Sequence, residues 1–193
     1  MPEAPFRLGF RVCDRRLAFL WDGPGQRSGR WNQAGDEPIH YMASSPMVAW
    51  AEWLRHEEIE DPADLEGIAA ALWAVLIPEA WGPDHLAAVP LPLHTVLSTT
   101  EAAAQARLNQ VAMLKLCGAT GLKAPTAALL EVQSHRCLRV QQGANQMAAL
   151  PVAAEVIVLW CPANDLAGWC CVPEGRPGAE LLPLVRREGR LPQ

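Results

Sequence analysis

The spacing of hydrophobic residues predicts a helix over residues 46–56. Its apolar positions fall at i, i+3, i+4 and i+7, which places them on one face: Met47, Trp50, Ala51 and Leu54. Ser45 and Pro46 suit a helix start, because serine accepts a backbone N–H bond and proline is tolerated in the first turn. Glu52 interrupts this apolar stretch, and we expect it to point away from the centre of the apolar face.

A second helix is predicted to open at residues 99–101, to continue with apolar residues at helical spacing through Leu116, and to stop at Gly118 as its C-terminal cap. Short apolar runs bounded by polar or turn residues predict strands over 6–13, 17–21, 38–43, 71–78, 121–128 and 155–161. The run over 71–78 is too apolar for an exposed edge strand.

The remaining segments predict connections. Glycine and proline make residues 22–29 a loop, residues 57–64 form an acidic solvated connection, and prolines break 89–93 into a loop or edge segment. We find no internal repeat and no interdomain linker in the sequence. We therefore expect an α+β fold in a single domain spanning 1–193, with strands before and after two helices.

Composition narrows the function classes. Half of the residues are hydrophobic and 19% are charged, which is typical of a globular protein. The 16 basic and 21 acidic residues give a net charge of −5, and no long basic run is present. We therefore expect no direct nucleic-acid partner. No apolar segment approaches the roughly 18 residues of a membrane span, so we expect a cytoplasmic protein without membrane contact.

The cysteines predict neither disulfides nor a metal site. They form no Cys-x-x-Cys pair, and the chain is larger than a disulfide-stapled miniprotein. We interpret them as reduced thiols, mostly small core residues: Cys13, Cys117, Cys137, Cys161, Cys170 and Cys171.

Candidate chemistry gathers in residues 29–56. Glu52 lies between tryptophans, and a partly buried carboxylate is costly unless it meets water or a cation. Arg30 and Tyr41 precede it at equal spacing. Taken singly, each of the three would be an ordinary surface or half-buried residue.

In combination, the residues resemble a known family. The stretch GRWNQAG from Gly29, followed by IHYMASSPMVAWAEWLRH, resembles the RES domain, whose members carry a Gly-Arg-Trp-Asn turn, a strand tyrosine and a glutamate in the next helix. The segment FRV fits the family's first-strand arginine at Arg11. The resemblance implies a fold similar to ADP-ribosyltransferases, with a mixed β-sheet core flanked by helices.

The resemblance also implies roles for these residues, with NAD as substrate and no metal. Glu52 would stabilise an oxocarbenium-like ribose, Arg30 and Arg11 would hold the pyrophosphate or ribose, and Tyr41 would stack on nicotinamide. Trp31 and Asn32 of the same turn would contribute to substrate binding.

A third family signature is a serine, and here the sequence departs from the pattern. Thr126 stands where local context places that serine, and it keeps the hydroxyl while adding a methyl group. A competing alignment uses Ser134, which lies closer to a segment that resembles the family's Gly-x-Asn at Asn145. We favour Thr126 and keep Ser134 as the alternative.

RES proteins are typically toxins of bacterial toxin–antitoxin pairs that consume NAD. The implied activity is cleavage of the nicotinamide–ribose bond by hydrolysis or phosphorolysis, causing growth arrest that a cognate Xre-type antitoxin neutralises. Two alternatives stay open: ADP-ribosyl transfer to a host protein, and a degenerate fold that binds a nucleotide or partner without turnover. A homodimer and a toxin–antitoxin hetero-oligomer are the assemblies we consider.

Overall fold

A computed structural model describes residues 6–23, 26–35, 37–78, 85–130, 133–139 and 147–187. Within them, seven strands form one mixed sheet in the order β4-β5-β8-β2-β1-β3-β9. The strands are β1 (Phe6–Asp14), β2 (His40–Ala43), β3 (Ala70–Pro78), β4 (Leu86–Ala88), β5 (Gly121–Pro125), β8 (Glu155–Leu159) and β9 (Ala167–Gly175). β4 and β5 are parallel, and the other neighbours are antiparallel. A separate hairpin pairs β6 (Gln133–Arg139) with β7 (Met147–Ala153).

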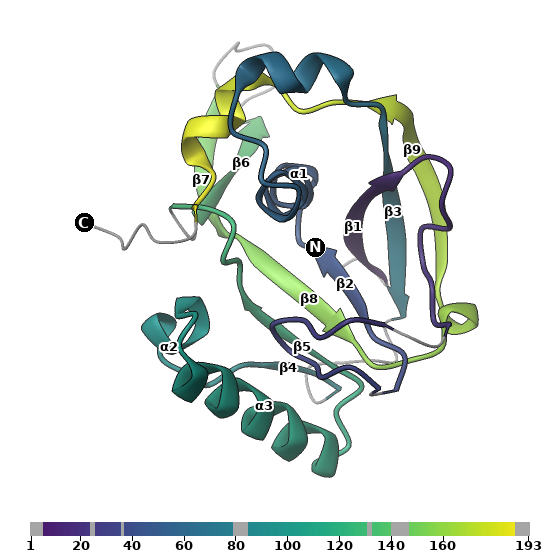
Figure 1. Cartoon of the computed structure of the whole chain (residues 1–193), viewed down its shortest axis with the longest axis vertical. Helices are drawn as coiled ribbons and strands as arrows, with labels where there is room; N and C mark the ends of the chain where they lie inside the picture. Colours follow the sequence, from purple (N-terminus) through teal and green to yellow (C-terminus); the bar gives the residue numbers. More distant parts are fainter. Residues whose placement is uncertain are drawn as a thin grey trace.

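The helices lie on two sides of this sheet. Figure 1 shows the sheet curving around α1 (Pro46–His56), while α2 (Leu93–Leu97) and α3 (Glu101–Leu116) lie outside the β4–β5 end. Three short 3₁₀ helices complete the described elements: η1 (Pro62–Gly67), η2 (Ala163–Asp165) and η3 (Ala179–Leu184). This mixed sheet with helices on both sides confirms the α+β class.

The apolar face of α1 forms a core with the sheet and η3. Trp50 and Leu54 pack there against Val12 of β1 and Leu181 of η3. Ser45 is the N-cap, as predicted, and its hydroxyl accepts the backbone N–H of Val48 at 3.3 Å. Packing against both the sheet and η3 fixes the rotation of α1 about its axis and therefore the direction in which Glu52 points.

Most predicted elements are confirmed. The helix over Glu101–Leu116 ends before Gly118, whose positive φ of 84° is the left-handed conformation that glycine adopts easily. The apolar run at 71–78 is β3, paired on both sides by β1 and β9 as its composition predicted. The strands over 38–43, 121–128 and 155–161 are shorter than predicted.

The predicted strand over 17–21 is wrong. Hydrogen bonds of the Arg16 amide and guanidinium to Asp14 turn the chain after β1. Phe19 then stacks on Trp73 with ring centroids 4.4 Å apart, and Leu20 is buried. These apolar residues therefore pack across the sheet from a loop instead of pairing within it. Part of the acidic connection likewise folds, as η1 begins at Pro62.

Among the described residues, no helix is both long and apolar enough to cross a membrane. Within the same residues, no cluster of three or more His, Cys, Asp or Glu side chains is placed to hold a metal ion.

Candidate functional site

The Gly-Arg-Trp-Asn segment forms a tight turn that begins at Gly29. The Gly29 amide donates to the Asn32 carbonyl at 3.1 Å. A Cβ at Gly29 would lie 2.6 Å from Asn32 Oδ1 and 2.8 Å from Tyr41 Oη. Trp31 is fully buried in a core with Val158. The turn therefore requires glycine at its first position and anchors itself through tryptophan.

Tyr41 of β2 is locked to this turn through its hydroxyl. Tyr41 Oη donates to Asn32 Oδ1 at 2.8 Å and accepts the Trp31 amide at 2.9 Å. Asn32 is only 3% exposed, and its amide donates to the carbonyls of Arg27 and Gln33. The half-buried Tyr41 therefore lines a cavity, and the buried Asn32 supports Tyr41 from the side facing away from that cavity.

Arg11 lies on β1, beside the strand pair with the fewest paired positions in the sheet. β1 and β2 pair at one position, Phe10 with Ala43. Beyond it, Arg11 Nη1 donates to the Tyr41 carbonyl at 3.3 Å. Burial lowers the pKa of Arg11 from its ordinary value. Within the described part of the chain, no carboxylate forms a salt bridge with Arg11.

Arg30 is tied to the helical layer. Its Nη1 donates to the Val96 carbonyl at 2.8 Å and the Ser98 carbonyl at 3.4 Å, at the end of α2. Arg107 of α3 is 4% exposed and donates to the carbonyls of Arg30, Thr95 and Ser98. These bonds join the Gly-Arg-Trp-Asn turn to α2 and α3.

Glu52 of α1 is held from the opposite side by Thr126. Thr126 Oγ1 donates to Glu52 Oε1 at 2.5 Å and accepts the Ala128 amide at 3.0 Å. Thr126 is fully buried directly after β5. Because the amide occupies the hydroxyl as an acceptor, its proton is directed at the carboxylate.

A cavity of about 380 Å³ lies between these walls. It brings together five of the predicted residues: Arg11, Arg30, Trp31, Tyr41 and Glu52. Thr126 reaches it through its bond to Glu52, and the neighbouring Ala127 lines it. Ser134 lies on β6 with its side chain outside the described structure, and Asn145 falls outside the described residues.

Sequence reasoning did not assign three further lining residues of α1: Trp53, Arg55 and His56. Arg55 and His56 follow Glu52 by three and four positions, so helical spacing places them beside it, but that spacing assigned them no role in the site. Glu52, Arg55 and His56 also line a second cavity of about 590 Å³ that extends toward η3. Glu52 therefore stands where two cavities meet.

The prediction that the cysteines are mostly core residues is wrong for the described ones: Cys161 is buried, but Cys117 and Cys171 are exposed because they lie at the end of α3 and on the edge strand β9. Burial raises the pKa of the Cys161 thiol to about 12, which keeps it protonated at neutral pH. Cys13, Cys117, Cys170 and Cys171 are also free thiols, while the side chain of Cys137 lies outside the described structure.

Comparisons with known proteins identify the family. No curated protein sequence matches this chain. A chain from the crystal structure of the M. tuberculosis MbcT–MbcA toxin–antitoxin complex is similar at a TM-score of 0.48 and 14% identity, over 93% of this chain and 88% of that chain. The sequence pattern of the RES domain matches residues 5–125. That match spans well over half of the protein, and the chain therefore belongs to the RES domain family.

Proposed function

We propose that this protein is an enzyme that breaks the bond between nicotinamide and ribose in NAD. The observation that carries the proposal is the carboxylate of Glu52, fixed by Thr126 and facing the same cavity as Arg11 and Tyr41. Membership of the RES family makes NAD the substrate of choice, because the activity implied for this family is NAD consumption.

The chemistry requires only one carboxylate. Nicotinamide departs from NAD as a neutral ring, so no general acid has to protonate it, unlike the two-carboxylate cleavage of an O-glycoside. Positive charge develops on the ribose as the bond breaks, and Glu52 would stabilise that charge. The Thr126 hydroxyl holds one carboxylate oxygen in place before the substrate arrives.

Arg11 would hold the pyrophosphate. It is a partly buried cation that forms no salt bridge within the described residues, and a guanidinium binds phosphate oxygens through paired N–H groups. Arg30 Nη1 is already bonded to two carbonyls, so we propose that Arg30 both supports the cavity wall and binds the substrate.

Aromatic rings would receive the nicotinamide. Tyr41 and Trp53 both line the cavity, and Trp53 contacts Trp50 edge-on with centroids 5.9 Å apart. The nicotinamide ring of NAD is cationic and is attracted to an aromatic face. The ring is neutral once released, so the same contact weakens after cleavage.

The identity of the nucleophile separates three reactions. Water gives free ADP-ribose, phosphate gives its phosphate ester, and a host protein becomes ADP-ribosylated. We further propose that the activity arrests growth and that an Xre-type antitoxin neutralises it, as the family resemblance implies. The test is the neighbouring reading frame: an Xre-type protein encoded there should abolish growth arrest when it is co-expressed with this chain.

The decisive experiment follows nicotinamide release from NAD by the pure protein. Glu52→Gln removes the charge but keeps the size, so we expect NAD binding to survive and turnover to fall roughly 100- to 1000-fold, by analogy with the loss of an oxyanion-hole donor. Glu57→Gln, the same change at the exposed C-cap of α1, is the matched control. Equal nicotinamide release by both variants would overturn the proposal.

A further inference from the structure

The direction of the Thr126 hydroxyl depends on the loop that follows it. Thr126 is joined to β5, but the bond that directs its proton comes from the Ala128 amide. Residues 126–130 form no regular helix or strand. Something outside this loop must therefore hold Ala128 in place.

The C-terminal strap, which we define as residues 184–186, holds that loop. The Arg186 amide donates to the Ala128 carbonyl at 2.6 Å, and the Leu130 amide donates to the Leu184 carbonyl at 2.9 Å. An isolated β-bridge joins Leu129 to Val185. Figure 1 shows the adjoining η3 helix beside α1, far along the chain from β5.

Arg186 adds side-chain bonds to this backbone pairing. Its Nε and Nη2 donate to the Leu129 carbonyl at 3.1 and 3.0 Å, and Nη2 also donates to the Leu130 carbonyl at 2.9 Å. Arg186 is only 6% exposed, and no carboxylate forms a salt bridge with it in the described part of the protein. Burying a cation against carbonyl groups alone costs free energy, but the bonds that Arg186 makes there fix the loop.

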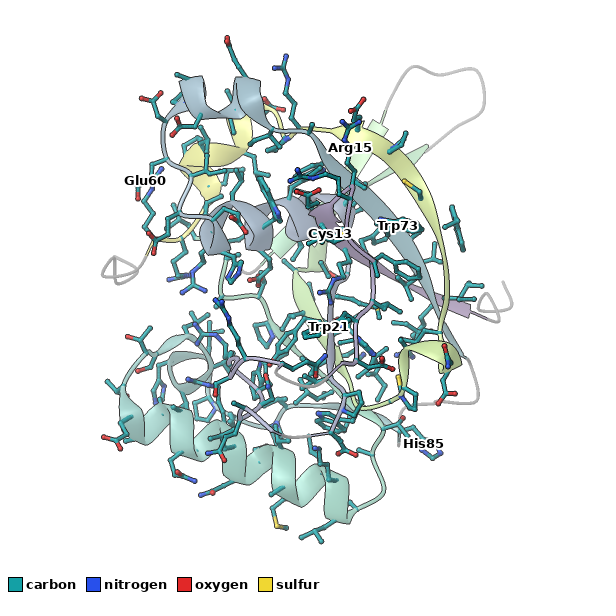
Figure 2. All side chains as sticks on the ribbon, turned by 45° about the vertical axis from the view of Figure 1, so that its right-hand side comes forward. Cys13, Arg15, Trp21, Glu60, Trp73 and His85 are labelled. Carbon is teal, nitrogen blue, oxygen red and sulfur yellow. The ribbon has the colours of Figure 1, made fainter. Side chains whose placement is uncertain are left out.

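The neighbouring arginine behaves differently. Arg187 forms an ion pair with Glu60, which Figure 2 shows on the side of the molecule where η3 lies. The Arg187 guanidinium binds an acidic side chain, whereas the three side-chain bonds of Arg186 lead to main-chain carbonyls of the loop. Arg187 therefore attaches the strap to Glu60, whereas Arg186 fixes the loop after Thr126.

We propose that Arg186 is a positioning residue for Glu52. It does not line the 380 Å³ cavity in which we place the substrate, although it lines the second cavity beside Glu52, and it acts through the loop and the Thr126 hydroxyl. This inference rests on the proposed function of Glu52. It extends the site past residue 125, where the family match ends, to a residue near the C-terminus of the chain.

The test is a double-mutant cycle on nicotinamide release. Arg186→Met should lower kcat about 10-fold with little change in KM, because substrate contacts remain while the carboxylate loses its fixed orientation. Arg186→Lys should recover part of that loss, since it can still donate to the carbonyls. Arg187→Met, which removes the adjacent charge, should keep kcat.

The Thr126→Val background decides whether the route is the one proposed. If Arg186 acts through the hydroxyl, Arg186→Met should have little further effect once the hydroxyl is gone. Independent, multiplicative losses of kcat would overturn the proposal, because they would show that Arg186 supports the fold in general.

A second measurement does not depend on NAD. Amide hydrogen exchange at Ala128, followed by NMR without nucleotide, should accelerate in Arg186→Met and stay slow in Arg187→Met. Unchanged exchange in Arg186→Met would overturn the positioning role even if the parent cleaves NAD. A parent protein that releases no nicotinamide, but shows the expected exchange difference, would instead reject the proposed function and leave the strap established.

Discussion

The two walls of the cavity are built in opposite ways. The turn wall, formed by Gly29–Asn32 and Tyr41, comes from one short stretch whose parts bond to each other. The carboxylate wall consists of Glu52 and Thr126, supported from behind by Arg186 through the loop after Thr126, and these three residues lie far apart in the sequence. A local wall can be recognised as a motif, whereas a wall assembled from distant segments becomes visible only in the fold.

The strongest test of the turn wall is Gly29→Ala. The added Cβ would press on Asn32 Oδ1 and Tyr41 Oη, so the bonds that close the wall must lengthen. We expect a loss of about 1–3 kcal/mol in the free energy of unfolding, measured in urea, as for other overpacked sites. Gly67→Ala has no heavy atom within 4 Å of the new Cβ and should be nearly neutral. Equal losses would mean that the close approach at Gly29 is unimportant.

The matching test of the carboxylate wall is Thr126→Val. Valine keeps the shape but loses the donor to Glu52 and the acceptor for Ala128, so nicotinamide release should fall by about 10-fold. Thr126→Ser should be tolerated because it retains the hydroxyl. Ser134→Ala should cost less than Thr126→Val, and the reverse order would favour the alternative alignment.

Tyr41→Phe separates the ring from the hydroxyl of the same residue. The two lost hydrogen bonds should cost about 1–3 kcal/mol of unfolding free energy, while the aromatic face stays in the cavity. KM for NAD should therefore change much less than stability. A large rise in KM without a loss of stability would show that the hydroxyl binds substrate.

The smallest expected effect is a pH dependence of stability that comes from His40 of β2. Burial and the charge of Arg11 lower the pKa of the fully buried His40. The unfolded chain then binds more protons than the folded one near and below pH 6.5, so stability should fall as pH drops through that region, by at most about 1.4 kcal/mol per unit. His40→Phe should flatten this slope in urea titrations at pH 5.5 and 7. The exposed His94→Phe variant is the control.

The same contrast explains how much the sequence could predict. The helix at 46–56, its cap and the direction of Glu52 follow from local spacing, and the Gly-Arg-Trp-Asn motif places Arg30 and Tyr41 around one cavity. Thr126 was favoured over Ser134 from local context, and the structure bonds Thr126 to Glu52. These features depend on neighbours in the chain.

Other features had no local signal. Arg186 lies in a segment whose proline, glycine and arginine content is typical of a solvated tail, yet it is buried on carbonyl groups of a distant loop. The edge strand β9 was missed because most of its side chains are exposed and its hydrophobic pattern is weak. Residues 17–21 show the converse, since an apolar run can pack on a sheet from a loop.

Because β1 and β2 pair at a single position, the sheet has a seam between these two strands. On one side of this seam lie β4, β5, β8 and β2, and on the other lie β1, β3 and β9. Besides that one pair, the two halves are joined by the bond from Arg11 to the Tyr41 carbonyl and by the core that both share with α1. Phe10 and Arg11 of β1 and Ala43 of β2 line the cavity that Glu52 faces, so this cavity lies where the strand ladder is interrupted.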